Sequence, residues 1–274
     1  METARLYVVA TPIGNLEDIS LRALDVLSKA DVVAAEDTRR TRQLLTRHGI
    51  DRPLVALHEH NEDKQSPQLV SRMLQGESVA LVSDAGTPLL SDPGYRLVRL
   101  AAEKGIEAVA VPGPSAITAA LSIGGLPTDR FVFEGFLPAK SVARGKKLQT
   151  LAGEPGTLVF FESSHRIVAC LSDLEQAFGG ERPAAVCREL TKQFETVLRG
   201  GLADIRKAVE SDANQQKGEF VVLVGGCEES TDKRLAAAIE LAGELKEHVG
   251  ASQAARIAAH IHGASRRDIY QAMK

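Results

Sequence analysis

Four short segments, three of them rich in glycine and proline, place hydroxyl, carboxyl and guanidinium groups where a small polar ligand could be bound. They are TPIGN at 11–15, EDTR at 36–39, SDAGTP at 83–88 and PGPSA at 112–116. Glycine lets the backbone approach a ligand closely, and proline fixes the shape of a loop in advance. Each segment alone could be a tight strand-to-helix turn. Because all four follow runs that predict parallel strands, we expect them to share one edge of a sheet and to form a binding cleft there.

The segments that must position these loops alternate between two periods. Apolar, β-branched runs predict strands at 6–10, 31–35, 53–57, 78–82 and 107–111. Helices are predicted between them, beginning at Thr38, Ser66 and Asp92, the last two because a proline follows each capping residue. Short crossovers of this kind produce a parallel sheet covered by helices on both faces.

A turn-rich stretch, GGLPTD at 124–129, interrupts this rhythm. Further strands are predicted at 131–136, 157–161, 184–189, 195–199 and 219–224, with helices near 144–152, 165–178 and 202–210, as in a mixed sheet. After a polar stretch at 227–232 the chain is alanine-rich, and Gly250 and Gly263 separate three predicted short helices. We therefore expect an N-terminal α/β domain at 1–124, a second α/β domain at 125–228 and a helical segment at 229–274, with the cleft between the first two.

Composition excludes several classes of protein. The 274 residues are 44% hydrophobic and 25% charged, with a net charge of −3, which is typical of a soluble globular chain and not of a uniformly basic nucleic-acid binder. Aromatic residues make up only 4%, too few for a surface of base-stacking rings. Three widely spaced cysteines without a CxxC motif suit a reducing compartment, and no apolar run approaches the ~18 residues of a membrane span. We expect a cytoplasmic protein.

Seven motifs in order carry a strong resemblance to a known family. They are TPIGNL at 11–16, AEDTR at 35–39, HEHNE at 58–62, SDAGTP at 83–88, VPGPSA at 111–116, FESSHR at 161–166 and RELTK at 188–192. Together they resemble the bacterial ribosomal RNA small subunit methyltransferase I family, of the tetrapyrrole-methylase fold group, over about residues 5–225. The P-loop, the GxGxxG fingerprint, the GxSxG elbow and the HExxH helix are all absent from the sequence.

The resemblance implies a two-domain tetrapyrrole-methylase-like α/β fold, with a parallel-sheet N-terminal domain, a mixed-sheet second domain and a small helical C-terminal segment. It also implies a homodimer that uses S-adenosylmethionine, without a metal, to methylate the ribose 2′-hydroxyl of a cytidine in the decoding region of 16S RNA. The residues expected by similarity to bind the cofactor are Pro12, Ser83, Asp84, Gly86, Thr87, Ser115, Ala116, Phe136, Leu137, Phe161 and Ser163.

Methyl transfer from a sulfonium to oxygen is an in-line displacement, so alignment of donor and acceptor supplies most of the catalysis. A ribose hydroxyl is a weak acid, and a base near it would help as its proton leaves. The base candidates are Asp37, His58 and Glu59, within a wider set of Glu36, His60 and Glu62. The alternative for the two histidines is a polar strand end; a metal site would require a third ligand at clear spacing.

Residues 137–150 hold four basic side chains and no acid, which favours contact with phosphates: Lys140, Arg144, Lys146 and Lys147. A surface loop without a partner is the alternative. We assign the same RNA-binding role to Arg266 and Arg267 in the helical segment. Arg39, Arg40, Arg42 and Arg47, by contrast, are expected to form a solvated helix face. The predicted partner is 16S RNA or the small ribosomal subunit.

Two other functions stay open at this point. One is methylation of a tetrapyrrole carbon by an enzyme of the same fold, and the other is a non-catalytic RNA-binding module that retains a cofactor cleft. The basic stretch and the helical tail favour RNA over a tetrapyrrole, because a porphyrin-like ligand requires neither.

Overall fold

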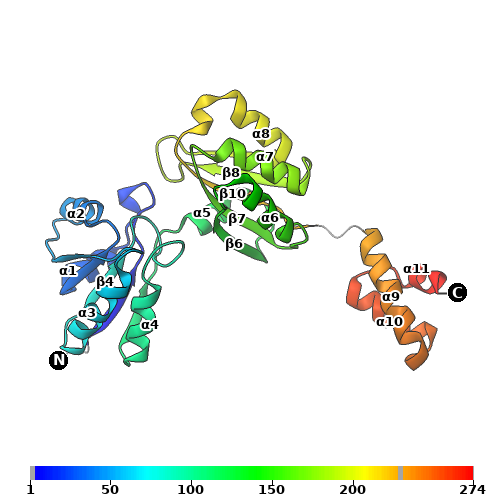
Figure 1. The fold of residues 1–274 in the computed structure, drawn as a ribbon, viewed down its shortest axis with the longest axis horizontal. Helices are drawn as coiled ribbons and strands as arrows, with labels where there is room; N and C mark the ends of the chain where they lie inside the picture. Colours follow the sequence, from blue (N-terminus) through cyan, green and yellow to red (C-terminus); the bar gives the residue numbers. More distant parts are fainter. Residues whose placement is uncertain (1–3, 228–230, 274) are drawn as a thin grey trace. The chain divides into compact units, whose positions relative to one another are not determined.

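The computed structural model describes residues 4–227 and 231–273 (Figure 1). Its strands are β1 (Arg5–Val9), β2 (Val32–Ala35), β3 (Leu54–Ala56), β4 (Val79–Val82), β5 (Glu107–Val111), β6 (Phe131–Phe136), β7 (Thr157–Ser163), β8 (Pro183–Arg188), β9 (Thr196–Gly201) and β10 (Glu219–Val224). Its α-helices are α1 (Leu21–Lys29), α2 (Thr38–Arg47), α3 (Glu62–Leu74), α4 (Tyr95–Glu103), α5 (Ala116–Gly124), α6 (Ser141–Leu151), α7 (Ile167–Phe178), α8 (Leu202–Ser211), α9 (Thr231–Val249), α10 (Ala251–His262) and α11 (Arg266–Ala272). Two short 3-10 helices, η1 (Leu16–Asp18) and η2 (Ala213–Gln216), complete the elements.

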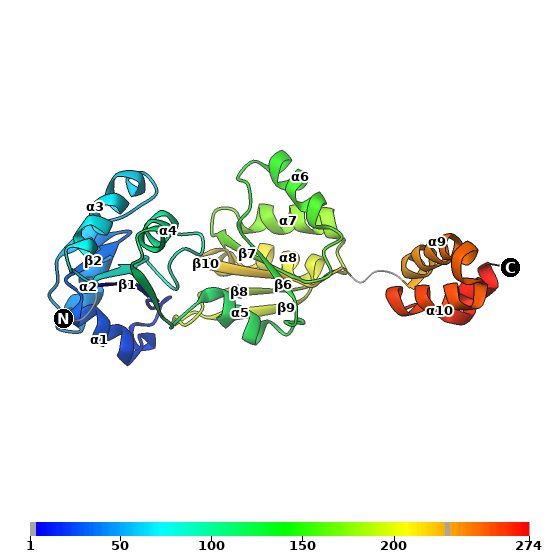
Figure 2. The ribbon, with the colours of Figure 1, turned by 90° about the horizontal axis from the view of Figure 1, so that it is seen from below.

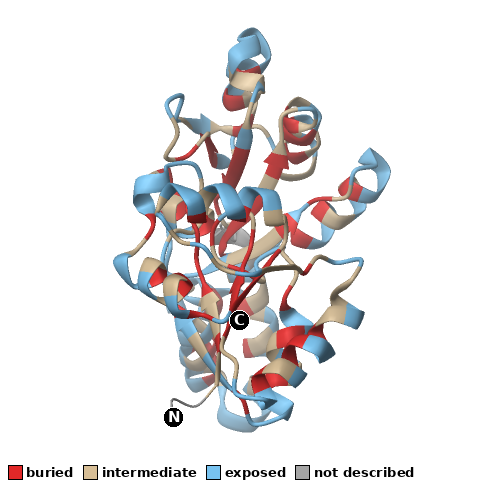
Figure 3. Ribbon diagram, turned by 90° about the vertical axis from the view of Figure 1, so that its left-hand side faces the viewer, coloured by how far each residue is buried: buried red, intermediate tan, exposed pale blue. Residues whose placement is uncertain are grey.

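The first sheet is parallel throughout, with strand order β3-β2-β4-β1-β5. Helices α3 and α4 pack on one face through Leu69, Met73 and Leu97. Helices α1 and α2 cover the other face through Leu27 and Leu45. Strands β2 and β4 are completely buried, as their unbroken apolar sequences predict. Figure 3 shows buried residues on the strands and on parts of the helices.

The second sheet is mixed, with strand order β6-β7-β10-β8-β9. Only β6 and β7 are parallel; β7, β10, β8 and β9 pair antiparallel in turn. Helix α5 packs on one face of this sheet through Ile117, Ala120 and Leu121, and α7 and α8 lie on the other face (Figure 2). The predicted α/β fold class, with one parallel and one mixed sheet, is confirmed.

The chain forms two compact units. One contains residues 1–149 and 157–225, and therefore both sheets; the other contains 150–156 and 226–274. In the second unit, α9, α10 and α11 bury a small core of Ala238, Ala242, Ala254, Ala258 and Ile269. Part of the predicted polar stretch at 227–232, and the predicted domain limits at 228 and 229, lie outside the described residues. The division at residue 124 stays a prediction, and the packing of α5 on the second sheet favours a limit before this helix.

The predicted starts of two helices, at Ser66 and at Asp92, are wrong. The Glu62 carboxylate explains the second difference, because it takes the capping role that was predicted for Asp92. Helix α3 begins at Glu62, so Ser66 is buried within it and Pro67 occupies an interior position. The Glu62 carboxylate accepts hydrogen bonds from the backbone N–H groups of Gly94 (3.0 Å) and Arg96 (2.8 Å), and it thereby caps α4. Asp92, which the sequence predicts as that cap, does not cap α4.

Two glycines in helices allow a test of how tightly the second sheet is covered. A Cβ atom added to Gly124, at the end of α5, would lie 2.3 Å from Cδ1 of the buried Leu223, whereas one added to Gly145 in α6 meets nothing within 4 Å. We expect Gly124→Ala to lower the free energy of unfolding by about 1–3 kcal/mol through overpacking. The control Gly145→Ala should raise it by about 0.5–1 kcal/mol through helix propensity. Denaturant titration measures both; equal effects would contradict the described packing of α5.

Candidate functional site

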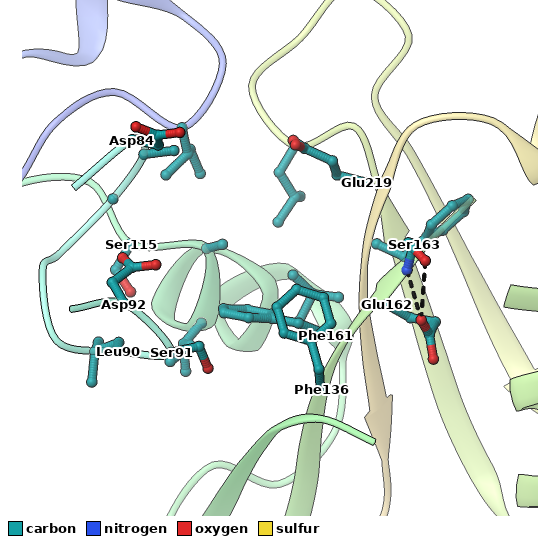
Figure 4. A pocket seen from close by; sticks show the side chains of 18 of the residues that line it. Asp84, Leu90, Ser91, Asp92, Ser115, Phe136, Phe161, Glu162, Ser163 and Glu219 are labelled. Atoms are coloured by element: carbon teal, nitrogen blue, oxygen red, sulfur yellow. Dashed lines mark hydrogen bonds between the residues drawn. The ribbon is translucent and has the colours of Figure 1, made fainter. Parts of the chain in front are cut away.

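A pocket of about 490 Å³ lies in the unit that contains both sheets, and residues of both sheets line it (Figure 4). The first sheet contributes the segments that follow β1, β2, β4 and β5, together with the start of α5. The second contributes β6, β7, the end of β8 and the start of β10. The volume lies within the range of roughly 300–1,000 Å³ typical of small-molecule sites.

Backbone hydrogen bonds tie the first-sheet segments together. Thr11 and Gly86 exchange two backbone hydrogen bonds, each 2.9 Å long, and link the segments after β1 and β4. The Thr87 hydroxyl donates to the carbonyl of Pro114 (3.2 Å), which adds the segment after β5. Gly86 has φ +81°, a conformation that a side chain rarely adopts, and its Cα faces Ile13. The predicted shared edge of the sheet is therefore present as one connected rim.

Two carboxylates link the segments after β2 and β4 reciprocally. The Glu36 carboxylate accepts from the backbone N–H of Asp84 (3.3 Å), and the Asp84 carboxylate accepts from the backbone N–H of Asp37 (2.9 Å). Arg40 on α2 lies 3.3 Å from the other oxygen of Asp84. Burial raises the pKa of Glu36, and the Asp84 charge raises it further. Glu36, Arg40 and Asp84 all line the pocket.

Asp92 completes the acidic wall of the pocket. Burial raises the pKa of Asp92 from 3.8 to about 6, with the neighbouring Glu36 charge acting in the same direction and a hydrogen bond with Ser83 opposing it. The segment that carries Asp92 is strained, because Leu89 and Ser91 have φ values of +74° and +69°. Such strain in non-glycine residues is concentrated at functional sites.

The second sheet supplies an aromatic surface opposite this acidic wall, as Figure 4 shows for Phe136 and Phe161. The two rings are edge-on, with centroids 5.6 Å apart, and Phe133 packs against Phe161 from within the core. Gly135, which lies between Phe133 and Phe136 in β6, adopts φ +65°, and a Cβ atom there would lie 2.8 Å from the Ser91 hydroxyl. The pairing register of β6 with β7 shifts between Phe133 and Gly135. Glycine at this irregularity allows the segment that carries Asp92 to lie directly against the second sheet.

Buried charges support the second-sheet side of the pocket from behind. Glu162 is fully buried, accepts from the backbone N–H of Ser163 (2.8 Å) and pairs with Arg166 (3.2 Å). Arg166 also donates to the carbonyl of Leu137. These charges hold the ends of β6 and β7 in position, so the FESSHR motif both lines the pocket, from Phe161 to Ser164, and supports it through the Glu162–Arg166 pair.

The structure gathers most of the residues predicted to bind the cofactor. Eight of the eleven line the pocket: Asp84, Gly86, Thr87, Ser115, Ala116, Phe136, Phe161 and Ser163. Pro12 and Ser83 line a smaller neighbouring hollow instead. Leu137 is buried, with 3% of its surface exposed, and does not reach the pocket, because β6 directs Phe136 toward it.

The three predicted base candidates do not line the pocket, and their role stays a prediction. The Asp37 carboxylate accepts from the backbone N–H of Arg39 at the start of α2 and pairs with the Arg39 side chain, which lowers its pKa far below the usual value. His58 lies at the turn before α3, where its backbone N–H donates to Asn61 (2.9 Å). Glu59 is 82% exposed beside His60. The rings of His58 and His60 are close, with centroids 6.0 Å apart.

The predicted RNA-binding residues divide into buried and exposed ones. Arg144 is only 3% exposed and pairs with Asp173 (2.6 Å), so it is a packing residue of α6 and the prediction is wrong for it. Lys147 pairs with Glu134 (2.7 Å). Lys140, Lys146, Arg266 and Arg267 are exposed, and Arg266 donates to the Ser252 hydroxyl.

Asp92, Lys192 and Glu219 are among the pocket residues that the sequence alone did not assign to the site. Lys192 lies between Glu189 (2.9 Å) and Glu219 (2.6 Å). A signal for Asp92 was present in its position shortly after SDAGTP, but Asp-Pro at a predicted helix start equally suits a capping residue. Among the described residues, no group of three histidine, cysteine or acidic side chains could hold a metal ion. None of the described helices combines the length and hydrophobicity that crossing a bilayer requires.

Comparison with known proteins then identifies the family. Residues 5–206 match the family described as Tetrapyrrole (Corrin/Porphyrin) Methylases, and residues 233–273 match the one described as RsmI C-terminal HTH domain. The chain is 55% identical to ribosomal RNA small subunit methyltransferase I of Xylella fastidiosa strain Temecula1, over 97% of each chain. It is 50% identical to the Pseudomonas aeruginosa protein of that name, over 99% of this chain and 97% of the relative. The chain belongs to the ribosomal RNA small subunit methyltransferase I family.

Membership in this family makes the chain a methyltransferase, as predicted. Solved structures agree on the fold. A uroporphyrin-III C-methyltransferase from Thermus thermophilus, crystallised with S-adenyl homocysteine, has a TM-score of 0.56 at 20% identity and covers 81% of this chain and 97% of its own. A diphthine synthase has a TM-score of 0.60 at 19% identity, covering 81% and 90%. At these identities the likeness concerns the fold alone.

The raised pKa of Asp92 makes a prediction about stability. An acid whose pKa is raised by folding stabilises the protein below its ordinary pKa of 3.8, and that contribution is lost as pH rises through about 6. Asparagine carries no charge, so Asp92→Asn should gain stability relative to wild type between pH 4 and pH 7, by on the order of 1 kcal/mol because the side chain is partly exposed to solvent. Urea unfolding at several pH values measures the difference. A difference independent of pH would contradict the buried position of this carboxylate.

Proposed function

We propose that this chain transfers the methyl group of S-adenosylmethionine to the ribose 2′-hydroxyl of a cytidine in the decoding region of 16S ribosomal RNA. Membership in the family supports methylation of small-subunit ribosomal RNA. The observation that carries the proposal is the pocket, in which eight residues expected by resemblance to bind the cofactor lie together.

The lining of the pocket fits the proposed methyl donor. Glu36, Asp84 and Asp92 would offset the positive charges of the sulfonium and the amino group, and Phe136 and Phe161 offer apolar surface to a purine ring. Gly86, Ser115 and Ala116 line the pocket with small side chains or none, which allows close approach of a polar ligand to their backbone. When bound, S-adenosylmethionine supplies a methyl carbon already activated for displacement by the positive sulfur.

The chain contributes orientation and a proton acceptor. The connected rim described above fixes the donor side in advance, which lowers the entropic cost of alignment with a ribose oxygen. We assign proton acceptance to Asp92, because its pKa of about 6 leaves it ionised yet basic at neutral pH. Unlike Glu36 and Asp84, it accepts no backbone hydrogen bond in the described structure. Its hydrogen bond is with the Ser83 side chain, which a substrate hydroxyl could replace.

The proposed activity has a direct test. The chain is incubated with radiolabelled S-adenosylmethionine and either small ribosomal subunits or protein-free 16S RNA, and the RNA is digested to nucleosides. We expect label in 2′-O-methylcytidine at one position, where the methylated ribose resists alkaline cleavage of the next phosphodiester. Label at a base atom would contradict the 2′-hydroxyl assignment. Label only in an added porphyrinoid would favour the tetrapyrrole alternative, and RNA binding without label would favour the non-catalytic module.

Asp84 tests the cofactor assignment. Asp84→Ala should weaken S-adenosylmethionine binding by about tenfold or more, because a charged hydrogen-bond partner is lost, and should affect RNA binding less. Isothermal titration measures both affinities. Asp31→Ala is the matched control, since Asp31 accepts from the backbone N–H of Ser78 at the opposite ends of β2 and β4, outside the pocket. Equal cofactor affinity of wild type and Asp84→Ala would refute the assignment.

Asp92 tests the proton acceptor. We expect Asp92→Asn to lower kcat by about 10²-fold or more with a smaller change in cofactor affinity. In the wild type kcat should rise with pH through about 6, where Asp92 ionises, and the variant should lack this rise. Single-turnover rates between pH 5 and pH 8 measure the profile. An unchanged profile in the variant would transfer the role to another group.

The homodimer and the cytoplasmic location implied by the resemblance are also part of this proposal. Sedimentation of the purified chain tests the dimer. Strongly exposed apolar side chains such as Leu21 and Phe194, which are 87% and 62% exposed, are positions at which an interface would be sought first.

A further inference from the structure

Helix α2 carries a basic face next to the pocket, and only part of its charge is paired with acids. Its sequence, TRRTRQLLTR, contains four arginines and no acid, and Arg39, Arg40, Arg42 and Arg47 are all exposed. Arg39 pairs with Asp37 and Arg40 with Asp84, but in the described part of the chain neither Arg42 nor Arg47 makes an ion pair. On α4, over the opposite face of the same sheet, Arg96 and Arg99 pair with Asp63 and Glu103.

This basic face is hollowed and continuous with the pocket. A shallow depression of about 630 Å³ runs along α2, lined by Thr38, Arg39, Arg42, Gln43, Thr46 and Arg47. Gln43 also lines a second hollow of about 230 Å³, which in turn shares Arg40 and Asp84 with the pocket. A path of three adjoining depressions therefore leads from the proposed methyl donor to the outer arginines.

The chemistry of the depression favours phosphate as its ligand. Arginine presents a planar fork of donors that matches phosphate oxygens, and unpaired, exposed arginines give up few existing contacts when they bind one. The lining contains no large apolar side chain, so it offers nothing of the hydrophobic core that a protein interface usually has. A chain of phosphates that continues from a nucleotide held at the pocket would pass along this helix.

We propose that the depression on α2 binds the sugar-phosphate backbone of 16S RNA beside the target nucleotide, with Arg42 and Arg47 as its principal phosphate contacts. This inference rests on the proposed function and deepens it by assigning the RNA surface. It places on α2 a role that the sequence interpretation gave to residues 140–147, of which Arg144 is buried and Lys147 is paired.

The first experiment measures binding of small ribosomal subunits by Arg42→Gln/Arg47→Gln over a range of salt concentrations. Each lost phosphate contact should reduce the slope of log K against log salt by about one, so we expect a reduction of about two. Arg96→Gln/Arg99→Gln is the matched control, because it removes the same charge from the opposite face of the sheet. The control should retain the wild-type slope. An unchanged slope in the α2 variant, or an equal reduction in the control, would overturn the proposal.

The second experiment identifies the contacted molecule. A benzophenone amino acid is incorporated at Thr46, which is exposed between the two arginines, and the enzyme is irradiated on the small subunit. Crosslinks to 16S RNA near the methylated cytidine support the proposal. Crosslinks to a ribosomal protein, or to RNA remote from that cytidine, overturn it.

Failure of this inference and failure of the proposed function give different results. If wild type methylates 16S RNA while the α2 variant keeps its salt slope and its KM for the subunit, only the assignment of α2 is wrong. If wild type transfers no methyl group to the subunit, the proposed function itself fails. Cofactor titration of the α2 variant at wild-type affinity verifies that the variant is folded.

Discussion

The site depends on hydrogen bonds that bind the segments after four parallel strands into one rim. Thr11 and Gly86 are joined by two backbone hydrogen bonds. The Glu36 carboxylate accepts from the backbone N–H of Asp84, and the Asp84 carboxylate accepts from the backbone N–H of Asp37. These acids are partly buried, where a hydrogen bond to the charged form is worth more than in water. A ligand that enters the pocket therefore meets groups already held in position, and little ordering of loops opposes its binding.

That arrangement has an energetic cost, which is visible in two places. Glu36, Asp84 and Asp92 lie together on one wall of the pocket, so burial and mutual repulsion raise the pKa values of Glu36 and Asp92. Leu89 and Ser91 are held in left-handed conformations by the segment that presents Asp92. Both features are unfavourable in the free protein. A cationic ligand would reduce the repulsion among the carboxylates, and its contacts with the strained segment would offset the backbone strain. The burial of apolar side chains on β2, β4, β7 and β10 stabilises the two sheets and offsets this cost.

Much of the fold followed from pattern alone. Apolar and β-branched runs predicted every strand to within about two residues. The signal is clearest for β2 and β4, because strands buried on both faces must be apolar at each position. Eight of the eleven cofactor residues implied by the resemblance line the pocket. Five of them belong to the SDAGTP and PGPSA segments, which follow parallel strands and therefore gather at one edge of the sheet: Asp84, Gly86, Thr87, Ser115 and Ala116. The base candidates lie outside the pocket: Asp37 accepts a hydrogen bond at the start of α2, and a local motif does not reveal whether its side chain caps a helix or faces a ligand. The sequence likewise did not reveal that Arg144 is buried, because its partner Asp173 is distant in the chain.

By itself the sequence determined the α/β class, the order of strands and helices, the loops that form the rim and the family to which the chain belongs. These properties depend on local periodicity and on short motifs, which are complete in a stretch of a few residues. Only the tertiary structure decided that Asp92 faces the pocket, since Glu62 caps α4 in its place from another helix. It also decided which arginines remain unpaired. Charge pairing and burial arise between residues far apart in the chain, and no local pattern specifies them.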